Sequence, residues 1–585
     1  MKLILSSLAQ KKEGKAELAL IFRTLHKHLL YVFGFSCWVN LLMLTGPIFM
    51  LQVYERVLSS RSEQTLLVLF SLVVALYAIM GSLDYIRGQV MARVGALFQD
   101  RLSDRAFNAA LAGAVSPEGK RAPAAALRDL DSIQAALAGP GCLAILDLPW
   151  LPIYLIIIYL FHPWLGILAT AAAILLIIVA LLGELTTKKK QQAALQADGG
   201  SRIVENTVWR DAEAVLALGM RQNFAKLWRN KKQEAQKARL DHNGLSGKFR
   251  TTAKSLRLLL QSAMLALGAL LVLKTEITPG VMIAASIIMG RALAPVDQLT
   301  GSYSALQNAR SALQDLEILF GSMPAEESKP LLPRPNGLIT VSKLAVGPPE
   351  TRDPLVRGLE FSIRPGEALG IIGPSGSGKS SLARTLAGIW KPLYGELRLD
   401  GATYDQWDPD VLGRLIGYLP QQNSLFQGSI TANIARFDPD ARFNDVVKAA
   451  TLAGAHEIIL KLPRGYETEI GQNGSGISGG QALLVSLARA FYGDPVLLVL
   501  DEPNAYLDAV GETALLDALQ KVKQRGTSIA IVAHNPRAIK HCENTLVIMD
   551  GYQNDFMATS EIIGKVTKPV NPPQKSIGQE ETTDL

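Results

Sequence analysis

Hydrophobic residues in the first half of the chain are grouped into six long runs. They cover residues 29–53, 65–86, 143–161, 164–183, 258–274 and 277–296. Each run is close to the about 20 residues that a helix needs to cross the hydrocarbon of a bilayer. Stretches such as Leu155–Leu160 and Ala171–Leu182 are apolar all round, which argues against the buried helices of a soluble domain. The pattern predicts six membrane spans.

Lys and Arg are distributed unevenly around these runs. Many lie in the first 28 residues and in two long loops, 87–140 and 184–255. The short loops on the other side carry only three, Arg56, Arg61 and Lys274. Because basic residues concentrate on the cytoplasmic side of membrane proteins, we expect both chain ends and both long loops in the cytoplasm. The loops have a helix-friendly composition, so the spanning helices are expected to continue beyond the membrane.

The composition and the hydrophobic pattern of the sequence change after residue 320. Residues 321–337 are rich in proline, which predicts a linker. In residues 338–565 short β-type runs alternate with helical stretches, as in an α/β unit with a largely parallel sheet. Residues 566–585 are polar and are predicted to be disordered. The expected fold is an N-terminal segment (1–28), an α-helical six-span transmembrane domain (29–320), the linker and the α/β domain.

A glycine-rich loop follows the apolar run Ala368–Ile372 and leads into a helical stretch beginning near Ser381. It reads Gly373, Pro374, Ser375, Gly376, Ser377, Gly378, Lys379, Ser380. Its backbone N–H groups and the following helix N-terminus suit phosphate oxygens. Lys379 is expected to neutralise the β- and γ-phosphates of ATP, and the Ser380 hydroxyl to hold Mg²⁺. The loop predicts a nucleotide-binding site.

Two acidic residues follow the buried-type strand Val496–Leu500. They fall where the carboxyl ends of strands hold ligands in α/β sheets. Asp501 is expected to hold the Mg²⁺ hydration shell, and Glu502 to polarise the attacking water as a general base. An acidic turn that solvates a strand end is the plainer reading, and the phosphate loop makes it the weaker one.

Composition changes this picture little. Hydrophobic residues make up 49% of the chain, which suits a membrane protein, and the net charge of +7 selects no class of partner. The three cysteines are far apart, so no zinc or redox spacing is present. Asp147 is the polar residue of most interest within a span. We expect it near the cytoplasmic end, within reach of water and in a structural role.

Several further segments resemble those of ABC ATPases. Ile477, Ser478, Gly479, Gly480 and Gln481 form a sequence similar to the family signature, about twenty residues before Asp501. Gln421, Asp508 and His534 stand in the order that the family shows. In the membrane half, the segments Met50–Leu58 and Asp147–Trp150 resemble the type I protein-secretion exporters, in the metalloprotease-secretion branch.

This resemblance implies a homodimer. ATP held by Lys379 and Ser380 of one copy would be covered by Ser478 and Gly480 of the other. Gln421 would contact Mg²⁺ and report the γ-phosphate to the membrane helices, His534 would orient that phosphate, and Asp508 would connect the two sites. The implied setting is the bacterial inner membrane, in contact with lipid. The implied partners are a periplasmic membrane-fusion adaptor, an outer-membrane channel and an unfolded secreted protein, without nucleic acid.

The sequence departs from the family at a few positions. Ala345–Pro349 lacks the aromatic residue that usually stacks on adenine. The other departures are Gln472, the run Ala482–Val485 and Tyr506. Because the hydrolytic residues are intact, we expect ATP hydrolysis with altered coupling. Export of a lipid, drug or small peptide remains an alternative, and a non-transport ABC ATPase a remote one.

Overall fold

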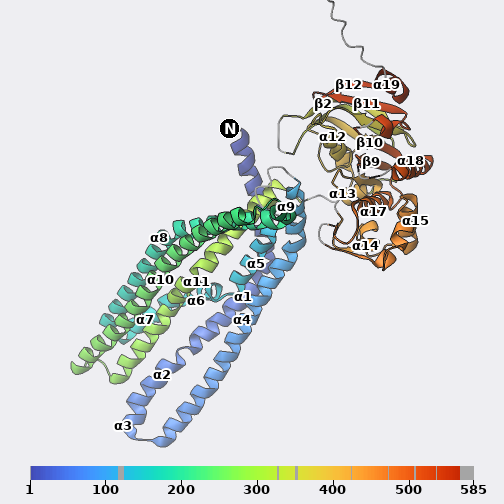
Figure 1. The fold of residues 1–585 in the computed structure, drawn as a ribbon. Helices are drawn as coiled ribbons and strands as arrows, with labels where there is room; N and C mark the ends of the chain where they lie inside the picture. Colours follow the sequence, from blue (N-terminus) through green and yellow to red (C-terminus); the bar gives the residue numbers. More distant parts are fainter. Residues whose placement is uncertain are drawn as a thin grey trace, which may run out of the picture. The chain divides into compact units, whose positions relative to one another are not determined.

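The structure is a computed structural model that describes residues 2–115, 124–325, 329–349, 353–422, 425–471, 474–505, 507, 509–534 and 536–566. The chain forms two compact units, residues 1–113 with 121–325, and the remainder. The predicted tail, apart from Val566, and the positions Gln472, Tyr506 and Asp508 lie outside the described residues. Figure 1 shows both units.

The first unit is entirely helical among its described residues. Its helices are α1 (Lys2–Leu42), α2 (Thr45–Gln52), α3 (Leu58–Ser60), α4 (Glu63–Ala114), α5 (Ala124–Ala138), α6 (Pro140–Asp147), α7 (Trp150–Phe161), α8 (Pro163–Arg210), α9 (Ala212–Ala217), α10 (Arg221–Leu273) and α11 (Pro279–Ser322). A short π-helical turn, Val53–Val57, joins α2 to α3. Among the described residues, five helical segments are long and apolar enough to cross a membrane, and the bent pair α6–α7 makes a sixth if it is counted as one span. The unit is therefore a multi-pass transmembrane domain.

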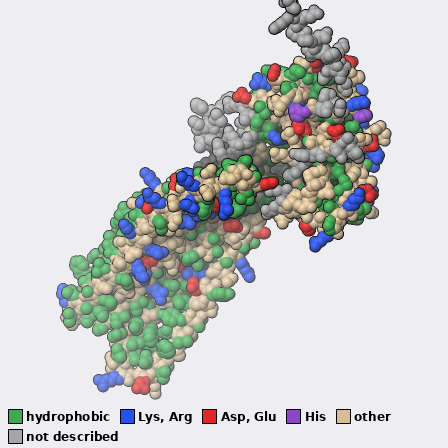
Figure 2. All heavy atoms as spheres, viewed as in Figure 1, with side chains coloured by type: hydrophobic (Ala, Val, Ile, Leu, Met, Phe, Trp, Pro, Cys, Tyr) green, Lys and Arg blue, Asp and Glu red, His purple; other side chains and the backbone are tan. Residues whose placement is uncertain are grey.

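The three longest of the described helices far exceed the length that a membrane span requires. α4, α8 and α10 contain 52, 48 and 53 residues. At about 1.5 Å per residue each exceeds the hydrocarbon thickness more than twofold. α8 and α10 run side by side and are joined through α9 (Figure 1). Figure 2 shows hydrophobic side chains covering one end of this unit, with Lys and Arg gathered toward the other.

The third apolar run differs from the expected continuous helix. It is broken at Leu148 and Pro149, and the axes of α6 and α7 meet at 48°. Pro149 causes the break because its ring cannot donate a backbone hydrogen bond and clashes with the carbonyl four residues earlier.

The prediction that water reaches Asp147 is wrong. The residue is 6% exposed, accepts a hydrogen bond from Asn40 of α1 and pairs with Arg87 of α4. Side chains on neighbouring helices cover the carboxylate, which a pattern along one span does not reveal.

The second unit is an α/β domain. Its strands are β1 (Ile339–Val346), β2 (Val356–Ile363), β3 (Ala368–Ile372), β4 (Tyr394–Leu399), β5 (Ala402–Thr403), β6 (Ile416–Leu419), β7 (Gly428–Ser429), β8 (Glu469–Ile470), β9 (Leu497–Asp501), β10 (Ser528–Val532), β11 (Asn544–Met549) and β12 (Tyr552–Ala558). Its helices are α12 (Lys379–Leu386), α13 (Pro409–Leu415), α14 (Ile430–Ile434), α15 (Phe443–Leu452), α16 (His456–Leu460), α17 (Gly479–Phe491), α18 (Ala509–Gln524) and α19 (Thr559–Val566).

Ten strands form one sheet in the order β5-β4-β1-β2-β12-β11-β3-β10-β9-β6. The five strands from β11 to β6 are parallel. Alternate residues of β9 face opposite cores, since Leu498 and Leu500 pack with α14–α18 while Leu497 and Val499 pack with α12 and α13. Burial on both faces explains why these strands read as continuous apolar runs.

The rest of the sheet is more antiparallel than the sequence pattern indicated. β1 pairs antiparallel with β2 and β4, and β11 with β12. Two tight turns account for part of the difference. Asp400 and Gly401 join β4 to β5, Asp550 and Gly551 join β11 to β12, and all four residues have positive φ. Asp-Gly pairs favour such two-residue hairpins, so the signal was present in the sequence.

Candidate nucleotide site

The candidate residues come from the carboxyl ends of four neighbouring parallel strands. β3 leads into the glycine-rich loop, β10 ends just before His534, β9 ends at Asp501, and β6 ends just before Gln421. Because parallel strands in register place their carboxyl ends at one edge of the sheet, these groups converge there. The α/β topology therefore assembles one site from segments more than 150 residues apart in the chain.

The loop requires glycine at specific positions. Gly376 and Gly378 have φ values of +83° and +96°, which side chains rarely tolerate. A Cβ on Gly378 would lie 2.2 Å from Cγ2 of Val356, and one on Gly373 would lie 2.2 Å from the carbonyl oxygen of Ile548. The backbone can therefore fold tightly over the start of α12 only with these residues. Pro374 and Ser375 complete the turn.

Lys379 lies at the first position of α12 and is only 5% exposed. Its Nζ donates to the carbonyl oxygens of Gly373 and Pro374, at 2.9 and 2.8 Å. Burial lowers the pKa of this ammonium, while the negative charges of Glu502 and Asp501 act in the opposite direction. The side chain is thus held inside the curve of the loop, where a phosphate would add a further counter-charge.

Ser380 and Asp501 meet across the site. The Ser380 hydroxyl donates to Oδ1 of Asp501 at 3.3 Å, and Asp501 is 2% exposed. Burial raises the pKa of this carboxyl, and the Ser380 hydrogen bond partly opposes the shift. A hydroxyl beside a carboxylate is the oxygen donor set that Mg²⁺ prefers.

Two further serines of the loop are buried. The Ser377 hydroxyl is buried without a hydrogen-bond partner among the described residues, and it would gain one from a phosphate oxygen. Ser381 is 7% exposed, one turn before Thr385, whose hydroxyl donates to the Ser381 carbonyl. The residues present therefore fit a nucleotide with its magnesium ion.

Glu502 and His534 form a second pair at the same edge. Nε2 of His534 lies 2.8 Å from Oε1 of Glu502, whose side chain is 18% exposed. Glu502 has a φ of +55°, and its backbone N–H donates to the carbonyl of Val532. A left-handed backbone at a residue other than glycine costs about 1 kcal/mol or more and is enriched at functional sites. This conformation turns the carboxylate toward the strand that carries His534.

Ser478, Gly479, Gly480 and Gln481 form the start of α17. The Ser478 hydroxyl accepts from the Gln481 backbone N–H, and the Gln481 side chain accepts from the Ser478 backbone N–H. This reciprocal cap fixes the helix N-terminus and leaves Ser478 and Gly479 exposed. Within the described residues, no hydrogen bond or ion pair joins these four residues to the glycine-rich loop.

Other candidate positions are less informative. Gln421 is exposed after β6, and Asp508 lies outside the described residues. Ala345 and Val346, in the segment that lacks an aromatic residue, are buried in β1. Arg384 was not among the predicted residues, yet its charge acts on Asp501 from the next turn of α12. The sequence signal for Arg384 is its spacing of four residues from Ser380, which places both residues on one face of the helix.

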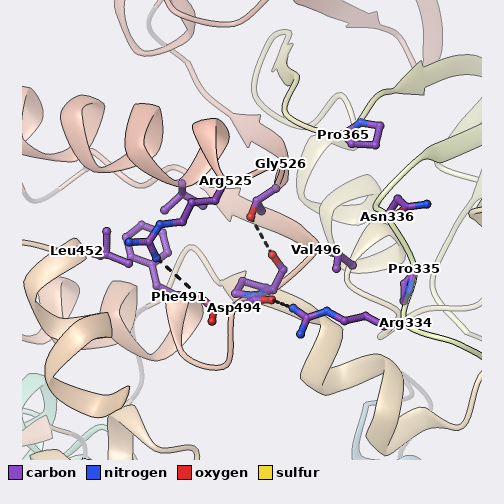
Figure 3. A pocket seen from close by; sticks show the side chains of 13 residues that line it. Arg334, Pro335, Asn336, Pro365, Leu452, Phe491, Asp494, Val496, Arg525 and Gly526 are labelled. Carbon is purple, nitrogen blue, oxygen red and sulfur yellow. Dashed lines mark hydrogen bonds and ion pairs between the residues drawn. The ribbon is translucent and has the colours of Figure 1, made fainter. Parts of the chain in front are cut away.

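A separate hollow of about 730 Å³ lies at the opposite end of the parallel strands (Figure 3). Pro365, Val496 and Thr527, which precede β3, β9 and β10, contribute to its lining. Arg334 donates to the Asp494 carbonyl at 2.6 Å across it. None of the predicted site residues that the structure describes lines this hollow, so it is distinct from the nucleotide site.

Comparison with known proteins agrees with this division of the chain. Residues 29–295 match the family model described as the ABC transporter transmembrane region, and residues 356–505 match the model described as ABC transporter. The chain is 40% identical over 534 residues to the type I secretion system ATP-binding protein PrsD of Rhizobium meliloti, covering 91% of this chain and 92% of that protein. It is 28% identical to the toxin RTX-I translocation ATP-binding protein of Actinobacillus pleuropneumoniae, covering 88% and 73%.

A solved structure shares the fold. The ATP-bound structure of a bacterial Atm1-family ABC exporter matches with a TM-score of 0.79 at 21% sequence identity, covering 93% of this chain and 96% of that chain. At this identity the match supports the architecture alone. The extended similarity to PrsD, together with both family matches, shows that the chain belongs to the ABC exporters of type I secretion systems, as a multi-pass membrane protein with an ATP-hydrolysing translocase domain.

Proposed function

We propose that two copies of this chain form an exporter that moves an unfolded protein out of the bacterial cytoplasm and uses Mg²⁺-dependent ATP hydrolysis. The observation that carries the proposal is the 40% identity to a type I secretion ATP-binding protein over 91% of the chain. The cargo class, the dimer and the magnesium ion go beyond that similarity.

ATP binds with its phosphates inside the loop Gly373–Ser381. The Lys379 ammonium is already enclosed by the loop. On binding it replaces its hydrogen bonds to the Gly373 and Pro374 carbonyl oxygens with hydrogen bonds to phosphate oxygens. Ser380, Asp501 and Gln421 would hold Mg²⁺, which would supply positive charge to offset the charge of the phosphates. Glu502 accepts a proton from the attacking water, and His534, 2.8 Å from its carboxylate, orients the γ-phosphate.

The second copy completes each site. Ser478, Gly479, Gly480 and Gln481 lie at a capped helix N-terminus, and a helix N-terminus favours an anion. In one chain these residues make no bond to the loop among the described residues, so they are available to cover the ATP held by the partner copy. Asp508 is the proposed link between the two sites.

The proposed setting is the bacterial inner membrane with both termini in the cytoplasm, as the distribution of Lys and Arg indicates. Export beyond that membrane would require a periplasmic membrane-fusion adaptor and an outer-membrane channel. The chain contacts lipid through its apolar spans, and we propose no nucleic-acid partner.

Gene deletion tests this function. We expect a defined set of proteins to disappear from the culture supernatant of the deletion strain and to return with the wild-type gene. The Glu502→Gln variant should not restore them, because the general base is lost. Glu457→Gln, an exposed residue of α16, serves as the control and should restore them. An unchanged supernatant with altered tolerance to drugs or lipids would instead indicate a small-molecule cargo.

A further inference from the structure

A buried polar cluster lies among the helices of the transmembrane domain. Nη1 of Arg87 donates to both carboxylate oxygens of Asp147, at 2.9 and 3.1 Å, and to the Ser36 hydroxyl at 3.1 Å. Asn40 donates to the same carboxylate at 2.7 Å, and the Tyr154 hydroxyl donates to the Asn40 carbonyl at 2.8 Å. All five residues are at least nine-tenths buried. The cluster joins α1, α4, α6 and α7.

The cluster occupies the point where two irregularities of the domain meet. Asp147 is the last residue of α6, directly before the break that bends α6 and α7 by 48°. Arg87 is the first buried residue of α4 counted from its Glu63 end. The apolar window of α4 has no buried residue, so α4 packs only loosely against the other described helices in that window. The ion pair therefore attaches α4 to the hinge of a broken span, and the hydrogen bonds of Ser36 and Asn40 attach α1 to the same point.

Stability alone does not explain an ion pair at this place. Removing two charges from water is costly, and apolar side chains of similar volume usually stabilise a buried site as well or better. A buried ion pair can instead fix one specific arrangement of helices, and packed elements that switch do so between such discrete arrangements. ATP-driven alternation between two conformations requires such elements.

Arg87 has a second carboxylate partner that would lower the cost of separation. Its Nε donates to Oδ1 of Asp84 at 2.6 Å, one turn earlier on the same helix. The Asp84 side chain is 54% exposed, whereas that of Asp147 is 8% exposed. If α6 moves away, Arg87 stays neutralised by Asp84, and Asp147 keeps the Asn40 amide. Neither charge is then left without a partner.

We propose that the Arg87–Asp147 pair is a latch that opens and closes once in each ATP cycle, and that Arg87, Asp147 and Asp84 are positioning residues for export. The export part rests on the proposed function, whereas the opening can be measured without any cargo. The latch gives the hinge at Pro149 two defined states, one with α6 fixed to α4 and one with α6 released.

Thiol labelling tests the opening. Ser36→Cys places a thiol inside the cluster without removing either charge. In the same protein the native cysteines Cys37, Cys142 and Cys542 are replaced by alanine. Glu502→Gln is added so that the protein binds ATP without hydrolysing it. In lipid nanodiscs we expect a small methanethiosulfonate to label Ser36→Cys at least about tenfold faster with Mg-ATP than without nucleotide, as a shift toward an open population requires. Ala172→Cys, fully buried in α8, is the control and should label slowly in both conditions. Equal rates for Ser36→Cys overturn the latch, whatever the cargo is.

Measuring export by variants tests whether Arg87 exchanges Asp147 for Asp84 when the latch opens. Asp84→Asn should reduce the deletion-sensitive supernatant proteins by about tenfold, at an unchanged melting temperature, because opening then leaves Arg87 without a counter-charge. The apolar pair Arg87→Met with Asp147→Leu should keep its melting temperature and ATP hydrolysis but lose export. Lys231→Gln with Glu234→Gln, an exposed pair on α10, is the control and should export normally.

Normal export by the apolar pair shows that the ion pair is only structural and overturns the proposal. If even the wild-type gene restores no secreted protein, the proposed function fails, and the labelling result still decides the latch.

Discussion

Gly378 has a backbone conformation that a side chain would disturb. Its φ is +96°, and an added Cβ would lie 2.2 Å from Val356. We expect Gly378→Ala to move the loop and to weaken ATP binding at least about tenfold, with a loss of about 1–3 kcal/mol of folding stability. Equilibrium binding of a fluorescent ATP analogue and thermal unfolding measure the two effects.

Gly413→Ala is the matched control for this substitution. Gly413 lies in α13, has no positive φ and has open space where a Cβ would be placed. Alanine should therefore leave ATP binding unchanged and stabilise the helix by up to about 1 kcal/mol. Equal losses in the two variants would contradict the steric argument for Gly378.

The Cys542 thiol is expected not to react with alkylating reagents in the folded protein. The residue is 7% exposed, and burial together with the charge of Glu543 raises its pKa to about 12, while Lys523 acts in the opposite direction. Because the thiolate is the reactive form, the thiol stays protonated and unreactive at pH 8.5 and begins to ionise only as the pH approaches 12. Iodoacetamide at pH 8.5 should therefore modify Cys542 only after denaturation.

An exposed cysteine provides the comparison. In the protein with Cys37 and Cys142 replaced by alanine, Glu457→Cys should react in the native state at pH 8.5, because Glu457 is exposed on α16. Mass spectrometry of native and denatured samples separates the two sites. Rapid native labelling at Cys542 would show that its surroundings open to solvent.

At the scale of elements, the break between α6 and α7 is the feature with the clearest consequence. Pro149→Ala restores the missing N–H and removes the ring clash, so α6 and α7 should become closer to one continuous helix. Straightening would displace Asp147 from Arg87, so we expect ATP hydrolysis to continue while secretion falls. Parallel ATPase and supernatant assays measure the difference.

Pro152 allows a control on the same helix. It lies in the first turn of α7, where proline is tolerated because the N–H groups there have no helical partner. Pro152→Ala should therefore leave both secretion and ATP hydrolysis close to wild type. Equal secretion by the Pro149 and Pro152 variants would argue against a role for the bend.

The elements also show how far the sequence allowed prediction. The long apolar runs and the strand-loop-helix around Lys379 were recognisable, because each signal is local and repeats with a known period. The bend at Pro149 and the hairpins at Asp400 and Asp550 also have local signals in the sequence, a proline within an apolar run and two Asp-Gly pairs. The pairing of Asp147 with Arg87 could not be predicted, because it depends on how separate helices pack. The pairing of Glu502 with His534 likewise depends on strand order.

At the scale of the molecule, charge is concentrated in one region. Residues 188–257, in α8, α9 and α10, contain 16 Lys and Arg but 6 Asp and Glu, an excess greater than the +7 of the whole chain. If this region lies in the cytoplasm, a membrane-impermeant maleimide should label Thr275→Cys in intact spheroplasts and Asn230→Cys only after lysis. Both positions are exposed, so accessibility of the side chain itself does not differ. The reverse labelling pattern would invert the proposed orientation.

Mixed dimers test whether two copies share each ATP site. A dimer of two Lys379→Ala chains has two defective sites, and so does a dimer of two Ser478→Ala chains. In a mixed dimer, one site combines both defects and the other combines an intact Lys379 with an intact Ser478. Coexpression should therefore restore ATP hydrolysis in about half of the dimers, given random pairing and sites formed between the copies. Isolation of dimers through two different affinity tags enriches the mixed species, and their ATPase rate should exceed that of either parent. If each chain held a complete site, the mixed dimer would contain no intact site and would remain as inactive as its parents.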